Sequence, residues 1–379
     1  MRTDRDAELT QHVLTDDQIQ EFVQHGVLVV SDILTTQEVN DAMLGLEQTL
    51  TRHGVDTKNL EGTGRGLAQL SSTNGSGGVL DLFYDNWKMA IASHPRLFRA
   101  TTQLWGAAYC HRGEQREDVP RDDMFKWHPY GPFEPNRGFM YVDRVGYRLP
   151  TMLAEKLGGN VSGLQTTDSA KTKKCKPLQR SLTPHLDCCP GTFFSETNAK
   201  WRPIQCFVSL TTNLDQNTGG FEAASGFHRD FEEWAASRPP SVISRKINGI
   251  SRKTAVPAPC LGEYTHIRPR EDSGIMKRMK HIPVTAGSAV FWDNRIPHGN
   301  AYRNDSDHAR VVVYCSFLPD VAVNRPFVDR QLHNFLRLRN PSDQWINTRH
   351  REEEDKGDVG LDHVSGLSVL GRTLLRVDD

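Results

Sequence analysis

Short runs of β-branched and aromatic residues, each bounded by turn-forming residues, constrain the fold of this 379-residue chain more than any other feature. The runs are FMYVDRVGYRL (139–149), IQCFVSLTTNL (204–214), SAVFWDN (288–294) and RVVVYCSFL (310–318). The last run alternates, so Arg310, Val312, Tyr314 and Ser316 share one face of the predicted strand. This spacing predicts an all-β barrel or sandwich that begins near residue 138.

Helical patterns precede this β-rich part. Thr15 with Gln18, and Thr35 with Glu38, are capping-box patterns that each open an amphipathic stretch. Gly26 predicts the end of the first helix, and the VLVV that follows it reads as a short buried strand. The N-terminal part is therefore expected to run helix, strand, helix.

The remaining segments are read more coarsely. Residues 54–78 are rich in Gly, Ser and Thr and predict an exposed loop, and a third helical stretch is expected near Trp87–Trp105. Residues 158–180 are also read as a loop, whose basic part could meet an acidic substrate. Helix is expected to return after about residue 327, and the acidic run at 351–358 is read as solvated.

Composition excludes several classes of protein. Lys plus Arg number 46 and Asp plus Glu 47, a net charge of −1 that indicates no nucleic-acid partner. No apolar run is long enough for a membrane span, and the N-terminus has no secretory h-region. The seven cysteines lack a C-x-x-C pair and indicate neither a disulfide framework nor structural zinc. We expect a cytoplasmic protein; residues 5–13 and the C-terminal VDD do not support a peroxisomal address.

The sharpest local motif is Pro184-His185-Leu186-Asp187. Because residues i and i+2 of a strand point to the same side, His185 and Asp187 can present an imidazole and a carboxylate to one point. The best candidate for a third ligand is His298, in FWDNRIPHGN. Two imidazoles and one carboxylate form the facial triad of non-haem Fe(II) oxygenases, which leaves coordination positions open. On its own, however, His-x-Asp is a frequent pairing, and most such pairs are surface or capping residues.

Arg310 follows His298 and opens a strongly apolar strand. A buried charge is costly unless it meets a counter-ion, and the planar guanidinium suits a carboxylate bidentately. Arg310 is therefore a candidate to hold the far carboxylate of a dicarboxylic co-substrate. The alternative is an internal ion pair with Asp293 or Asp305.

With these motifs in this order, the sequence resembles the phytanoyl-CoA dioxygenase family of Fe(II)/2-oxoglutarate oxygenases over most of residues 14–320. LTDDQIQEFVQHGVLVVSDILTTQEV resembles the family's N-terminal helix–strand–helix, HLD its His-x-Asp, and PHGN…R (297–310) its distal histidine and arginine. QNTGGFEAASGFHRDF (216–231) is similar to its Asn-Gly…Pro-Gly-Ser-His stretch. There, Ser225-Gly226-Phe227-His228 replaces the usual Pro-Gly-Ser-His.

The resemblance implies a double-stranded β-helix (jelly-roll, cupin-like) core in an α+β, mainly β chain, with iron held by His185, Asp187 and His298. It also implies that Arg310 binds the 5-carboxylate of 2-oxoglutarate and that Asn300 helps to hold it. The implied cofactors are Fe(II), 2-oxoglutarate as co-substrate, and O₂. The implied activity is that of a dioxygenase that hydroxylates a small organic substrate, with succinate and CO₂ as co-products. A CoA-ester substrate does not follow, because the family is broad.

We expect a single catalytic domain over residues 1–379. Helical elements at 14–137 would pack on a jelly-roll core at 138–320, and a helical tail would follow at 321–379. Further candidates for the wall of the active-site cavity are Tyr141, Arg148, Val208 and Trp292.

Two alternative functions stay open. One is a non-catalytic jelly-roll protein that binds a metal or a carboxylate, and the other is a zinc-dependent hydrolase on the same ligand set. The expected partner is a small molecule, with neither nucleic acid nor membrane, and the sequence does not indicate an oligomeric state.

Overall fold

The computed structural model describes residues 12–72, 74–109, 126–158, 176–191, 193, 200–237, 241–247, 250–256, 264–341 and 362–378. Most of the predicted basic loop, the acidic run at 351–358 and most of the segment at 5–13 lie outside these residues.

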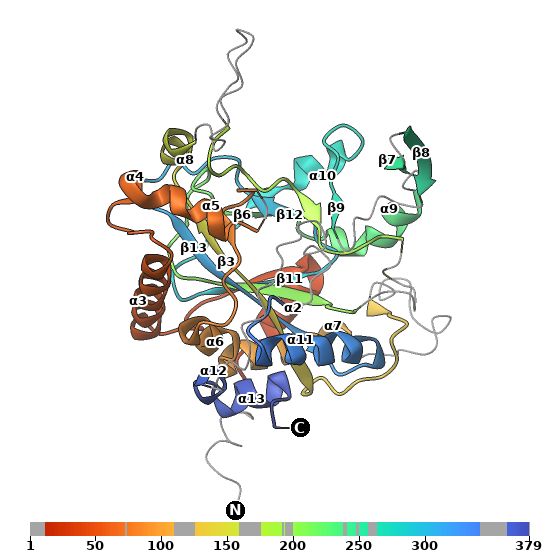
Figure 1. Ribbon diagram of the computed structural model, residues 1–379. Helices are drawn as coiled ribbons and strands as arrows, with labels where there is room; N and C mark the ends of the chain where they lie inside the picture. The colour runs from red at the N-terminus through yellow and green to blue at the C-terminus, as the bar shows by residue number, and fades with distance from the viewer. Residues whose placement is uncertain are drawn as a thin grey trace, which may run out of the picture.

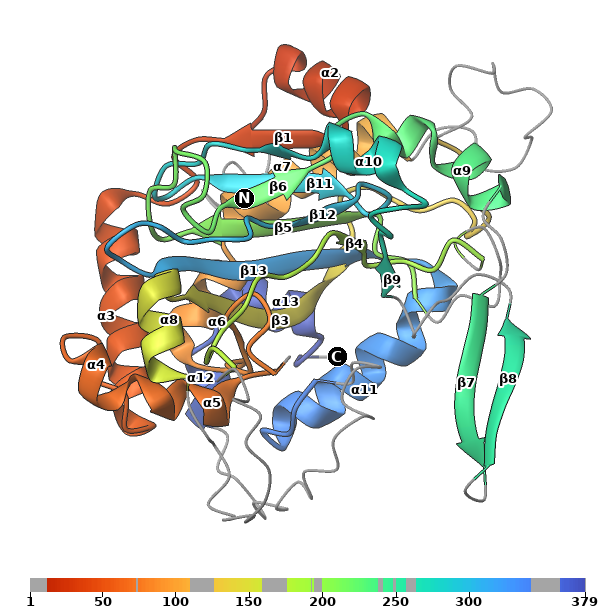
Figure 2. The same ribbon diagram turned by 90° about the horizontal axis from the view of Figure 1, so that it is seen from above.

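Two antiparallel sheets form the centre of an α+β fold (Figure 1). The larger sheet has the strand order β1 (Val27–Val30), β11 (Ala289–Asp293), β5 (Ile204–Ser209), β13 (Arg310–Pro319), β3 (Gly138–Arg148) and β2 (Val79–Leu80). The smaller sheet has the order β10 (Lys280–His281), β6 (Phe221–Ala223), β12 (His298–Asn300), β4 (His185–Leu186) and β9 (Thr265–His266). A separate hairpin, β7 (Ser241–Ile247) with β8 (Ile250–Val256), extends away from the sheets (Figure 2).

The helices lie mainly before and after the strands in the chain. Those of the N-terminal part are α2 (Asp16–His25), α3 (Thr36–Arg52), α4 (Leu60–Thr63), α5 (Leu67–Leu70), α6 (Asn86–Ala92) and α7 (Pro95–Ala108). Those among the strands are α8 (Thr151–Leu157), α9 (Phe231–Ser237) and α10 (Ser273–Arg278). The C-terminal ones are α11 (Arg325–Leu336), α12 (Asp362–Ser365) and α13 (Val369–Leu375), and short 3₁₀ turns lie at 64–66, 227–229 and 322–324.

The larger sheet separates two hydrophobic cores, and the alternation of β13 explains why. Val311, Val313, Cys315 and Phe317 pack with apolar side chains of the surrounding helices. Val312 lies in the second core, with side chains of the smaller sheet, and Tyr314 packs against that core. The predicted two-faced strand is therefore confirmed. Its second face is turned toward the smaller sheet, which in Figure 1 lies across the larger sheet from α6, α11 and α13.

The predicted N-terminal helix, strand and helix are also confirmed. Thr15 and Thr35 accept hydrogen bonds from the backbone N–H of Gln18 and Glu38, whose side chains reach back to the cap residues. Gly26 adopts a left-handed conformation with φ of 67° and ends α2.

The prediction of helix near Trp87–Trp105 is confirmed but was too coarse, and the loop prediction for residues 54–78 was wrong. The stretch near Trp87–Trp105 forms two helices, because Pro95 begins a new helix and leaves the preceding His94 extended. Residues 54–78 are not simply an exposed loop, since they form α4 and α5 and bury Val55, Leu67 and Leu70 in the core. Short helices of four residues leave little periodicity for a sequence pattern to show.

The cysteines differ from the expectation in one respect. Cys188, Cys206 and Cys315 are buried free thiols, whereas Cys189 is disulfide-bonded. A low cysteine count does not reveal a disulfide, since pairing depends on which cysteines the fold brings together.

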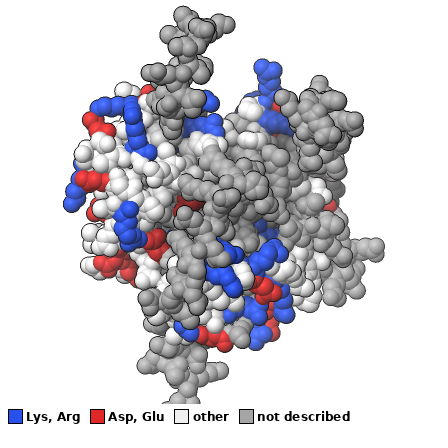
Figure 3. Space-filling view, in the orientation of Figure 1, with Lys and Arg blue, Asp and Glu red and all other residues white. Residues whose placement is uncertain are grey.

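Basic and acidic side chains of the described residues are interspersed on the face shown in Figure 3. Within the described ranges, none of the helices is both long and apolar enough to cross a membrane.

Candidate metal centre

Adjacent strands of the smaller sheet bring three metal-binding side chains together. His185 opens β4, Asp187 follows its end, and His298 opens β12. His185 and His298 are direct partners across the antiparallel pair, so their side chains leave the sheet on the same side. One donor atom from each histidine and one from Asp187 all lie within 4.8 Å of one another. The structure thus brings the three sequence-predicted ligands to one point.

Backbone carbonyls fix the orientation of both imidazoles. Nδ1 of His185 lies 2.8 Å from the carbonyl of Thr183, and Nδ1 of His298 lies 3.0 Å from that of Ile296. A carbonyl only accepts, so Nδ1 carries the proton in both rings and Nε2 keeps its lone pair. Nε2 of His185 is 3.4 Å from Oδ1 of Asp187, and Nε2 of His298 is 3.7 Å from Oδ2. The three free donors face one another, as a shared metal ion requires.

A chain of hydrogen bonds holds the carboxylate of Asp187. The amide nitrogen of Gln205 donates to Oδ2 at 2.7 Å, and Trp292 Nε1 donates to the amide oxygen of Gln205 at 3.0 Å. An indole N–H only donates, so the orientation of the Gln205 amide is fixed. Arg202 adds a positive charge, with Nη2 3.8 Å from the same oxygen. Among the described residues, Oδ1 receives no hydrogen bond and stays available to a metal.

Electrostatics favour the metal-binding protonation states of Asp187 and His298. Burial acts to raise the pKa of Asp187, but electrostatic interactions with His185, His298 and Arg202, together with the hydrogen bond from Gln205, outweigh it and lower that pKa. Burial and the neighbouring His185 lower the pKa of His298 to about 3. An ionised carboxylate and neutral imidazole nitrogens on one side of a site fit Fe(II), and the same donor set also binds zinc.

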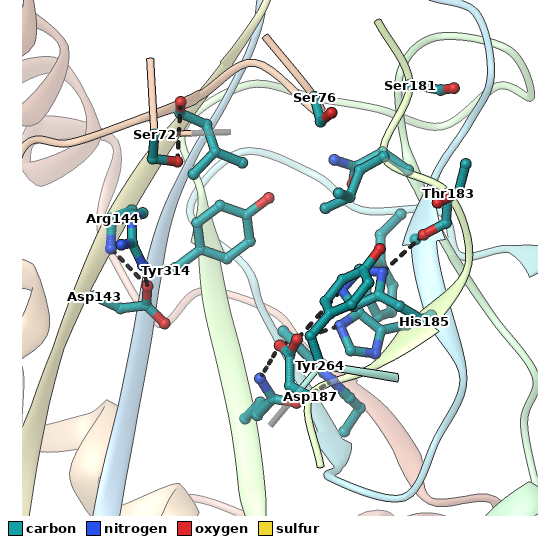
Figure 4. Close-up of a pocket in the computed structure, with 18 of the residues that line it drawn as sticks. Ser72, Ser76, Asp143, Arg144, Ser181, Thr183, His185, Asp187, Tyr264 and Tyr314 are labelled. Carbon is teal, nitrogen blue, oxygen red and sulfur yellow. Dashed lines mark hydrogen bonds and ion pairs between the residues drawn. The ribbon is translucent and has the colours of Figure 1, made fainter. Parts of the chain in front are cut away.

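The three ligands line a cavity of about 640 Å³ that opens between the sheets. In Figure 4, His185 and Asp187 lie on one side of this cavity, and Asp143, Arg144 and Tyr314 lie on the other. Tyr264 also lines it and stacks on the His185 ring, with centroids 4.7 Å apart.

The four further wall candidates divide evenly. Tyr141 and Trp292 line the cavity, whereas Arg148 and Val208 do not. Val208 is fully buried in the core that faces the helices, because it occupies the opposite face of β5 from Gln205. The sequence prediction of Val208 as a wall residue is therefore wrong. Arg148 does not line the cavity either, but its Nη2 lies 3.5 Å from the carbonyl of Tyr302, which does.

Sequence reasoning missed three residues at this centre. Gln205 was visible only as part of an apolar run, Arg202 carried no motif, and Tyr264 stands outside every predicted strand. The available signal was the alternation of side chains along β5, which places Gln205 on the face toward Asp187 once the register is known.

Arg310 is only 3% exposed and does not itself line the cavity. Its Nη1 donates to Oδ1 of Asn300 at 3.3 Å, and Asn300 itself lines the cavity. The alternative ion pairs considered for Arg310 are not formed. Asp293 is bound by Arg295, with contacts of 2.8 and 2.7 Å, and Asp305 by Arg303 at 2.8 Å.

Fold and donor set together define a two-sheet α+β protein with a two-histidine, one-carboxylate centre at a cavity. Solved structures share this fold. The chain matches GlcNAc Inducible Gene 2, GIG2 (DUF1479), of Candida albicans with a TM-score of 0.64 and 13% identity, over 97% of this chain and 78% of that one. It matches the hypothetical protein JW0805 of Escherichia coli with a TM-score of 0.60 and 11% identity, over 98% and 83% of the two chains. At these identities the likeness concerns the fold alone.

Neither a protein-family model nor a curated protein matches the chain. The resemblance to the phytanoyl-CoA dioxygenase family is therefore not confirmed and stays a prediction. The match to the epimerase SnoN, crystallised with Fe3+ and alpha ketoglutarate, is weaker, with a TM-score of 0.41 and 14% identity over 83% of this chain and 84% of that one.

Proposed function

We propose that this protein is an Fe(II)- and 2-oxoglutarate-dependent dioxygenase that hydroxylates a small organic substrate. The observation that carries the proposal is the convergence of His185, Asp187 and His298 at the wall of a cavity. Three donors on one side of a metal leave its other positions open to co-substrate and O₂. When bound, Fe(II) supplies the redox chemistry that couples reduction of O₂ to decarboxylation of 2-oxoglutarate.

The chain's own residues have distinct roles in this proposal. Gln205 and Arg202 hold the Asp187 carboxylate ionised and fixed, and the carbonyls of Thr183 and Ile296 hold the two imidazoles. Arg310 and Asn300 bind the far carboxylate of 2-oxoglutarate. One oxygen atom of O₂ enters the substrate as a hydroxyl group, the other enters succinate, and CO₂ is released.

The proposal includes the architecture of the core and the domain. Two facing antiparallel sheets with both ligand strands in the smaller one support a double-stranded β-helix. We assign residues 1–379 to a single catalytic domain, in which the helices pack around that core and the substrate enters the cavity as a small molecule.

An anaerobic titration with Fe(II) and 2-oxoglutarate tests the proposal. Chelation of the metal by the 2-oxo acid is expected to produce a weak visible charge-transfer band in the wild type. The band is expected to disappear in His298→Ala and to persist in His281→Ala. His281 is a matched control, because its Nε2 contacts the carbonyl of Leu214 and it does not line the cavity.

Turnover is then scored by succinate release across a panel of small metabolites. No visible band in the intact protein, or a band that His298→Ala leaves unchanged, would contradict the iron assignment. A zinc hydrolase would give no band and no succinate, and a binding protein would give the band without succinate under any condition.

A further inference from the structure

Two buried arginines stand side by side on the larger sheet. Arg148 ends β3 and Arg310 opens β13, and they are direct partners across this antiparallel pair. Directly opposed residues project from the same face, with Cβ atoms about 4.5–5.5 Å apart. Arg148 is 2% exposed and Arg310 is 3% exposed. The pair therefore places two positively charged side chains on one face of adjacent strands, away from water.

Neither guanidinium meets a carboxylate within the described part of the chain. Arg148 Nη2 lies 3.5 Å from the carbonyl of Tyr302, while its Nε and Nη1 are buried without a hydrogen-bond partner. Arg310 contacts the Asn300 amide oxygen and the Tyr314 hydroxyl, both of which are uncharged. The amide nitrogen of Asn300 is likewise buried without an acceptor. Three donor groups thus point to a missing acceptor.

The charged groups nearest the pair do not supply that acceptor. His281 is positive or neutral, so it cannot neutralise Arg310. The acidic residues closest to Arg310 in sequence, Asp307 and Asp305, are paired with His308 and Arg303. Burial lowers the pKa of Arg148 to about 10, so this side chain stays charged at neutral pH. Two adjacent buried cations without a counter-ion are unfavourable, and a bound anion relieves both at once.

The cavity gives an anion access to the pair. Arg310 reaches Asn300 and Arg148 reaches the backbone of Tyr302, and both contacted residues line the cavity. The two arginines thus approach one continuous stretch of chain, which begins at the ligand His298. Neither arginine lines the cavity itself, so an anion held at Asn300 and Tyr302 would lie one residue away from both guanidinium groups.

We propose that Arg148 and Arg310 form one carboxylate-binding site, with a guanidinium group for each oxygen. The ligand class is a dicarboxylate whose second end extends toward the metal centre. Its identification as 2-oxoglutarate rests on the proposed function, but the two-arginine site does not. Arg148 is the new member, and it makes the site select for a fully ionised carboxylate over an amide or ester at this position.

The test uses the full-length, metal-free protein and glutarate, a dicarboxylate without the 2-oxo group, so neither metal nor turnover is needed. Calorimetric titration measures glutarate affinity for the wild type, Arg148→Met, Arg310→Met and Arg303→Met. Arg303→Met is the matched control, because Arg303 is exposed and paired with Asp305. We expect the control to bind like the wild type, and each of the other two variants to bind about tenfold more weakly or worse.

Thermal unfolding separates a binding role from a structural one. Arg148→Met removes an unpaired buried cation, so without ligand it is expected to unfold at no lower a temperature than the wild type, and glutarate is expected to stabilise it less. Arg148→Lys keeps the charge but loses the planar guanidinium group, so its affinity for glutarate is expected to lie between those of the wild type and Arg148→Met. Wild-type glutarate affinity in Arg148→Met, loss of ligand-free stability in that variant, or no glutarate binding to the wild type would each overturn the proposal.

The outcomes separate this inference from the proposed function. Glutarate binding that depends on Arg148, in a protein that gives no charge-transfer band with Fe(II) and 2-oxoglutarate, refutes the dioxygenase alone. A charge-transfer band with Fe(II) and 2-oxoglutarate, together with glutarate affinity that is the same in Arg148→Met as in the wild type, refutes the two-arginine site alone.

Discussion

Replacing Gln205 with leucine is expected to weaken metal binding, although Gln205 contacts the ligand Asp187 and not the metal itself. The Gln205 amide joins Trp292 to Asp187, and leucine has a similar volume but neither donor nor acceptor. The substitution therefore frees the Asp187 carboxylate to rotate and leaves the indole N–H of Trp292 buried without an acceptor.

The magnitude follows from these two contacts. A hydrogen bond to a charged carboxylate contributes about 1.5–3 kcal/mol, and an unsatisfied buried N–H costs about 1–3 kcal/mol. Some of this loss is offset by the added apolar side chain, so we expect a net decrease of about 2–4 kcal/mol in the free energy of unfolding. Because Asp187 loses the group that orients it, metal affinity is expected to fall by about 10- to 100-fold.

Urea unfolding and an anaerobic Fe(II) titration against a competing chelator measure the two effects. Gln331→Leu is the matched control. Gln331 is also a fully buried glutamine with two hydrogen bonds, to the backbone of Met140 and Val142, but it lies outside the cavity wall. We expect it to lose comparable stability with unchanged metal affinity. Equal metal affinity in the two variants would refute the positioning role of Gln205.

Three further changes test the fold around the site. Asp293→Asn leaves the fully buried Arg295 without its counter-ion, so urea unfolding is expected to show a loss of about 3–5 kcal/mol; a loss under 1 kcal/mol would show that the pair does not hold the turn before the distal ligand. Burial lowers the pKa of His128 and of His228 to about 4, so the unfolded chain binds more protons than the folded one between pH about 6.5 and 4. As the pH is lowered through that window, the free energy of unfolding is therefore expected to decrease by up to about 1.4 kcal/mol per pH unit for each histidine. Urea midpoints at several pH values measure this slope, and His228→Asn should reduce it. Thr35→Ala removes a helix cap and is expected to cost about 0.5–2 kcal/mol, measured as a shift in the urea midpoint; no shift would show that the capping box is not needed.

Local patterns predicted the parts of the molecule that local physics determines. The capping boxes at Thr15 and Thr35 and the alternation of β13 depend on residues within a few positions of one another, and the structure shows all three. His185 and Asp187 were readable for the same reason, since a strand places i and i+2 on one side.

Contacts that depend on strand register could not be predicted. Which strand lies opposite Arg310 is decided by the pairing of β13 with β3, and no pattern in either strand specifies that partner. The same limit applies to the link between Gln205 and Trp292, and to Val208, whose orientation is reversed by a shift of one residue. Local sequence patterns therefore do not predict which distant segments pair in the sheets.

The strands that carry the ligands are short, and this affects how readily the smaller sheet unfolds locally. β4 has two residues and β12 has three, so few backbone hydrogen bonds join these segments, which are far apart along the chain. A metal ion bound by His185, Asp187 and His298 would close the long loop between them, much as a covalent cross-link would. Loss of the ion and local unfolding of the smaller sheet would then occur together, and amide protons of β4 and β12 would be expected to exchange with solvent at a rate that depends on metal concentration.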